Sequence, residues 1–125
     1  MRVTDFRYTE DLHLVRHRQG EGHLFYLAKP YRVAFKLDGE WTSWTVHEGT
    51  ATDFASIPKA VPRWIVDKLG PHVEAAVVHD DLCYCHPWDY KVAAEVFLAA
   101  MAAANVPEVT RNLMYRAVLI GGPRW

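Results

Sequence analysis

The first half of the chain alternates apolar and polar residues, a pattern that predicts β-strands. In residues 31–37, Tyr, Val, Phe and Leu alternate with Arg, Ala and Lys, and a second such segment covers residues 40–46. Asp38-Gly39 separates them, and Asp-Gly is preferred in two-residue turns with positive φ. Such a turn pairs Leu37 with Glu40 and brings the apolar residues of both strands to one face. The sequence therefore predicts an antiparallel hairpin here.

The second half predicts helices. A short helix is expected from near Pro58 to Gly70, and the next runs from Pro71 to about Cys83 or Tyr84. Apolar residues recur at helical spacing from Trp88 to Ala104. A last helix opens at Pro107 and stops at Gly121-Gly122-Pro123, and its predicted common face holds Val109, Leu113, Arg116, Ala117 and Ile120.

Strands followed by helices are typical of an α+β domain. Residues 13–18 and 23–28 predict an additional hairpin around Gly20-Glu21-Gly22. The chain has 125 residues, of which 50% are hydrophobic, and no linker or repeat divides it. We therefore expect one domain over residues 1–125, with antiparallel hairpins followed by three to four helices. A central buried helix is predicted to carry His79-Asp80.

Charge and cysteine content narrow the function classes. Lys and Arg number 14 against 15 Asp and Glu, without a basic run, so nucleic-acid binding is not expected. No apolar stretch reaches the roughly 20 residues that span a bilayer. Met1 is not followed by a secretory apolar region, and Cys83 and Cys85 are too close to close a useful loop. We expect free thiols and a cytoplasmic protein.

His79 and Asp80 lie in a segment, residues 73–82, that is apolar almost all round. A helix of this kind is buried, and a buried imidazole or carboxylate needs a partner. One interpretation is catalytic, with His79 as general base and Asp80 binding a metal or orienting a group. The other is structural, with both residues anchored to the backbone of a preceding loop.

Residues 52–58 contain two further candidates, Asp53 and Ser56. Ser56 precedes a Pro-started helix and suits a cap, and Asp53 suits an Asx turn. Alternatively, the Asp53 carboxylate reaches His79, fixes its tautomer or completes a metal site. Ser56 is the weaker nucleophile candidate because nothing nearby in the sequence activates it.

A cluster of cysteine and histidine follows His79. His79 and Cys83 are four residues apart, and Cys85 and His86 come next. Structural zinc sites pair their ligands as C-x2-4-C and H-x3-5-H, and Cys-x-Cys-His does not fit. A weak Ca²⁺ or Mg²⁺ site held by Asp53 and Asp80 is the better metal hypothesis, because carboxylates suit hard cations.

These segments resemble domain-of-unknown-function family 1353 (DUF1353). The resemblance rests on residues 49–58, on Ala75-Ala76-Val77-Val78-His79-Asp80, on residues 97–101 and on residues 113–118 with Trp125. It implies an origin in tailed phages or prophages, with the protein in the host cytoplasm or on the phage particle.

A second likeness is mechanistic. His79-Asp80-Asp81-Leu82-Cys83, with a second helix that contains residues 93–97, is similar to the two-helix core of A2-type secreted phospholipases. The likeness implies that His79 activates a water and that Asp80 binds calcium. Relatives typically place an acid three residues before the phenylalanine, where this chain has Ala94. Asp53, Asp89 or Glu95 would then supply the missing carboxylate.

Two functions remain. In the first, the protein is a small phage hydrolase with His79 as base and Asp53, Asp80 and Ser56 around it, acting on an ester, a lipid or a cell-wall bond. In the second, it is a virion component or host-protein-binding factor whose tryptophans form the contact surface. Ala94 favours the second. The co-occurrence of Asp53, Ser56, His79 and Asp80 favours the first, which is the interpretation we expect.

Overall fold

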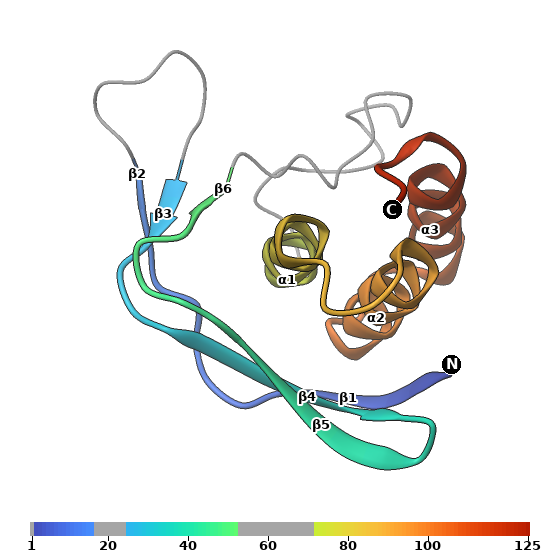
Figure 1. Ribbon diagram of the computed structural model, residues 1–125, viewed down its shortest axis with the longest axis horizontal. Coiled ribbons are helices and arrows are strands. Elements are labelled where there is room, and N and C mark those ends of the chain that lie inside the picture. Colours follow the sequence, from blue (N-terminus) through green and yellow to red (C-terminus); the bar gives the residue numbers. More distant parts are fainter. Residues whose placement is uncertain (1, 17–24, 53–71) are drawn as a thin grey trace.

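The computed structural model describes residues 2–16, 25–52 and 72–125 and shows an α+β fold, as predicted (Figure 1). One antiparallel sheet has the order β1-β4-β5, from β1 (Val3–Tyr8), β4 (Tyr31–Leu37) and β5 (Glu40–Val46). A second has the order β2-β3-β6, from β2 (Leu14–Arg16), β3 (Phe25–Leu27) and β6 (Ala51–Thr52). The expected Gly20-Glu21-Gly22 turn and the expected helix from Pro58 to Gly70 lie outside the described residues.

The β4–β5 hairpin has the predicted register. Leu37 pairs with Glu40, and Tyr31 with Val46. Asp38 and Gly39 have φ of 51° and 83°, the positive values that this turn requires. The antiparallel pairing of β2 with β3 also confirms the strand pair expected from residues 13–18 and 23–28.

Strand β1 has no counterpart in the sequence prediction. It pairs with β4, but its register shifts between Thr4 and Arg7, and Asp5 has a φ of 53°. An irregularity of this kind interrupts the alternation of inward and outward side chains. The pattern of residues 3–8 is therefore a poor signal for a strand, although tertiary pairing makes it one.

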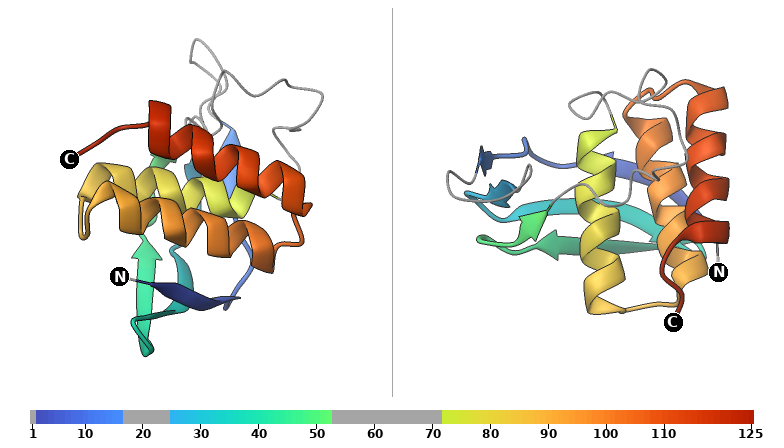
Figure 2. Two further views of the ribbon diagram at one scale, coloured as in Figure 1. Left: turned by 90° about the vertical axis from the view of Figure 1, so that its right-hand side faces the viewer. Right: turned by 90° about the horizontal axis from the view of Figure 1, so that it is seen from above.

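Residues 72–125 form three helices, α1 (Val73–Cys85), α2 (Tyr90–Ala103) and α3 (Glu108–Gly121), and α2 packs against both other helices (Figure 2). The Asp89 carboxylate caps α2 by accepting hydrogen bonds from the backbone N–H groups of residues 91 and 92. His86 and Asn105 follow α1 and α2 in left-handed conformation. No helix within the described ranges has the length and apolar character needed to cross a membrane.

The core lies between the β1-β4-β5 sheet and the helices. Phe35 and Val33 of β4 join Phe97 and Val96 of α2 there. The side of α3 singled out from the sequence is not its buried side, because Val109 and Ile120 are exposed and the buried residues are Met114 and Val118. The helix packs on α2 along this narrower line.

Candidate functional site

His79 lies on α1 at its contact with α2 and is only 4% exposed. Its ring stacks on Phe97, with centroids 4.8 Å apart and an interplanar angle of 23°. Burial lowers the pKa of His79 from 6.5 to about 4, because a charged imidazolium would lose its hydration. His79 is therefore neutral near pH 7 and is a weak base.

The thiol of Cys83 lies beside the His79 ring. Its Sγ lies 3.8 Å from Nδ1 and 3.6 Å from Nε2, so it does not single out one ring nitrogen. Burial raises the pKa of the Cys83 thiol to about 12, and the nearby charge of Asp80 acts in the same direction. The thiol is protonated at neutral pH, so this pair is not an activated Cys–His nucleophile.

The buried carboxylate of α1 is Asp81, which the sequence analysis did not single out. Asp80 is only half-buried, whereas Asp81 is buried and accepts a hydrogen bond from Trp44 Nε1 at 2.9 Å. The Cys85 thiol also donates to Asp81, at 3.8 Å. Burial raises the pKa of Asp81, and the two hydrogen bonds partly oppose this effect. Asp81 therefore joins α1 to β5.

The other predicted site residues separate into two groups. Asp53 and Ser56 lie outside the described residues, so their proximity to His79 stays a prediction. Asp89 caps α2, which gives it a structural task. Within residues 2–16, 25–52 and 72–125, no group of three His, Cys, Asp or Glu side chains is arranged to hold a metal ion.

Position 94, where the phospholipase likeness calls for an acid, is occupied by a buried alanine on α2. His79 contacts that helix through Phe97, three residues further along. An aromatic ring and a buried methyl group therefore occupy the side of α2 on which a helix-borne acid is expected. Glu95 is half-buried one position further on.

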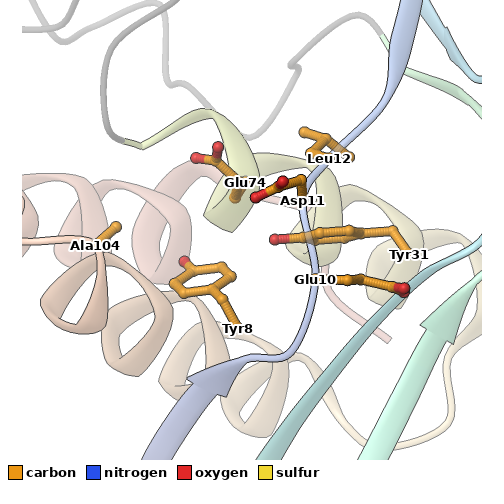
Figure 3. Close-up of a pocket in the computed structure, with 7 residues that line it drawn as sticks. All are labelled: Tyr8, Glu10, Asp11, Leu12, Tyr31, Glu74 and Ala104. Carbon is orange, nitrogen blue, oxygen red and sulfur yellow. The ribbon is translucent and has the colours of Figure 1, made fainter.

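A separate pocket of about 370 Å³ opens at the other end of α1 (Figure 3). It lies where the β1–β2 connection meets the first turn of α1, the start of β4 and the end of α2. Two tyrosines, three carboxylates and two apolar side chains line it: Tyr8, Glu10, Asp11, Leu12, Tyr31, Glu74 and Ala104. Sequence reasoning missed this pocket, because its residues are far apart in the chain and match no motif.

The tryptophans differ in how far the fold covers them. Trp44 and Trp88 pack against each other with ring centroids 5.9 Å apart, and Trp125 stacks on His86 at 4.2 Å. Trp41 is 51% exposed on β5. Arg7 and Lys36 lie over its ring at 4.8 and 5.3 Å from the centroid.

Comparison with known proteins agrees with the motif resemblance. The model of the family described as "Protein of unknown function (DUF1353)" matches residues 25–118. The chain belongs to the DUF1353 family. It is also 31% identical over 90 residues to "Uncharacterized protein y4iH" of Sinorhizobium fredii (strain NBRC 101917 / NGR234).

That match covers 71% of this chain and 38% of the relative, so the chain spans well under half of that protein's length. No solved structure matches the chain.

Proposed function

We propose that this DUF1353 chain is a phage- or prophage-encoded binding protein that contacts an acidic protein surface through Trp41. Its place of action would be the host cytoplasm or the phage particle. In this proposal His79 and Asp80 are structural anchors. The observation that carries it is the exposed Trp41 ring with Arg7 and Lys36 beside it.

The composition of this surface supports binding. Trp and Arg are enriched among the residues that dominate protein–protein affinity. Lys36 on β4 is the cross-strand partner of Trp41, and Arg7 comes from β1, which pairs with the other edge of β4. Arg7 and Lys36 border the ring, and Lys36 also forms an ion pair with Asp5 at 3.6 Å, so Arg7 is the main cation offered to an acidic surface.

The surroundings of His79 support the anchor role. Its ring is buried, packs flat on Phe97 and is poorly basic. A general base near neutral pH works best with a pKa close to the working pH. Ala94 leaves α2 without the carboxylate that would orient the imidazole.

Hydrolysis is the second candidate, because His79 is uncharged at neutral pH, as a base must be. In this mechanism Asp53 lies within hydrogen-bond or one-water reach of His79, Asp53 and Asp80 hold Ca²⁺ or Mg²⁺, and Ser56 lies nearby. The substrate would be an ester, a lipid or a cell-wall bond.

The binding proposal is tested with a photo-crosslinking residue at position 43, beside Trp41 on β5, in protein produced in its bacterial host. Trp41→Ala should abolish a discrete crosslinked product, and Arg7→Glu should reduce it. Tyr84→Ala is the matched control, because Tyr84 is an exposed aromatic residue on α1. Equal products from Trp41→Ala and the parent protein would exclude the Trp41 surface.

Hydrolysis is tested with His79→Gln, using ester and phospholipid substrates with and without Ca²⁺. Turnover that folded His79→Gln lacks, and that the parent protein retains, would establish the hydrolase. Ala94→Asp is a less direct test, because position 94 is buried and an unpaired carboxylate there is destabilising.

A further inference from the structure

We propose that the acidic pocket at the start of α1 binds an alkylammonium group, as in a small primary amine or a lysine side chain. This inference is independent of the Trp41 surface and of His79. It concerns a site where four chain segments meet and where the fold leaves negative charge beside a buried phenol (Figure 3).

The Tyr31 hydroxyl is the first observation that points to a ligand. Tyr31 is 1% exposed, and its hydroxyl is directed into the pocket, toward Glu74 and Tyr8. In the part of the chain that the structure describes, this hydroxyl has no hydrogen-bond partner, whereas the Tyr8 hydroxyl donates to the Ala100 carbonyl at 2.7 Å. Because this hydroxyl faces the pocket, a ligand bound there can supply its hydrogen-bond partner.

The charged side chains of the pocket decide which charge a ligand should carry. Asp11 and Glu74 place two carboxylates in the wall of the pocket. Among the described residues, neither has a Lys, Arg or His nitrogen within 4 Å. Glu10 accepts a hydrogen bond from the backbone N–H of Arg32 at 2.6 Å. A cation would therefore be the complementary ligand.

The tyrosines remain neutral beside these acids. Burial raises the pKa of both Tyr8 and Tyr31, and the charge of Glu74 adds to the effect at each. Each phenol oxygen retains lone pairs that accept a hydrogen bond. The pocket therefore offers phenol and carboxylate acceptors to an N–H donor.

The shape of the site favours an organic cation over a bare metal ion. The acidic side chains are spread around a pocket of about 370 Å³, which is in the range of small-molecule sites. They do not form a three-ligand metal group in the described part of the chain. Leu12 and Ala104 add apolar surface against which a short alkyl chain can pack. An ammonium group with an alkyl tail matches both the carboxylates and the apolar surface of the pocket.

The test uses amide chemical shifts of the whole protein, titrated with pentylammonium and, separately, with Nα-acetyl-lysine methylamide. Perturbations at residues 8–12, 31 and 74 with a Kd on the order of 1 mM are expected for so small a ligand. Stronger binding of the blocked lysine would indicate a lysine side chain as the ligand, and stronger binding of pentylammonium would indicate a free amine. Pentanol, the neutral analogue, should give none of these shifts.

Glu74→Gln should weaken binding by roughly 10-fold or more, because it removes a charged acceptor. Tyr31→Phe should weaken it several-fold. Glu108→Gln is the matched control, because Glu108 lies in the first turn of α3 as Glu74 does in α1. This control should bind like the parent protein.

The inference is wrong if neither amine perturbs these amides, if pentanol binds equally well, or if Glu108→Gln weakens binding as much as Glu74→Gln. Ca²⁺ that saturates the same amides at lower concentration than both amines would identify a metal site and would also overturn it. These outcomes do not depend on variants, apart from the Glu108 comparison, so an unstable Tyr31→Phe leaves the test intact.

Discussion

The stability of this protein should depend on pH through His79. The folded pKa of His79 is about 4, whereas the unfolded value is near 6.5, so the unfolded chain binds the extra proton between these pH values. Unfolding is therefore favoured as pH falls. The stabilisation is fully present above pH 6.5 and is lost as pH falls toward 4.

The size of the effect follows from the two pKa values. Each pKa unit corresponds to 1.36 kcal/mol, so a His79 pKa that is lowered from 6.5 in the unfolded chain to about 4 in the folded protein corresponds to about 3 kcal/mol of stability that is lost at low pH. No large correction for solvent screening is needed, because His79 is 4% exposed. A loss of this size is a large fraction of the free energy of unfolding of a typical small domain, roughly 5–15 kcal/mol.

The assay is urea unfolding of the parent protein and of His79→Gln between pH 7.5 and 4. Glutamine does not titrate, so the difference in free energy of unfolding between the two proteins should shift by about 3 kcal/mol across this range in favour of His79→Gln. Asp81, whose pKa is raised, contributes the opposite pH dependence, but it is present in both proteins and cancels. His13→Gln, at an exposed histidine, should follow the parent protein.

A pH-independent difference between the parent protein and His79→Gln would refute this reasoning. It would show that His79 titrates near 6.5 and is hydrated. A hydrated His79 would strengthen the hydrolase candidate.

Two further predictions concern the other polar side chains of α1 and their partners. Trp44→Phe removes the indole N–H that donates to Asp81 and should lower the free energy of unfolding by about 1–3 kcal/mol. Trp41→Phe, at the exposed position, should change it by less than about 0.5 kcal/mol. Urea unfolding measures both, and equal losses would contradict the stabilising role of the Trp44–Asp81 hydrogen bond. Iodoacetamide should alkylate the exposed Cys85 before the half-buried Cys83, whose thiol pKa is raised to about 12. Peptide mass spectrometry of samples taken at intervals measures the order of alkylation. Faster reaction at Cys83 would show that its thiol is activated.

The candidate site was only partly predictable from the sequence. The apolar sequence around His79 indicated that this polar residue is buried and needs a partner. In the structure its imidazole stacks on Phe97. Which carboxylate is buried was not evident, because Asp80 and Asp81 are adjacent and point about 100° apart on a helix. Only the position of Trp44 on β5 selects Asp81.

Local signals determined most of the fold. The alternation around Asp38-Gly39 set the hairpin and its register, since a turn and a hydrophobic face that agree leave one pairing. Asn105 and Pro107 marked the boundary between α2 and α3, because Asn commonly ends a helix and Pro commonly begins one. Tertiary structure decided strand β1, whose irregular pattern becomes a strand only by pairing with β4. It also decided the buried side of α3, because apolar residues occur around that helix and only contact with α2 selects Met114 and Val118. The Tyr31 pocket depends on tertiary structure alone, since its walls come from segments that share no local signal and meet only when helices and sheet pack.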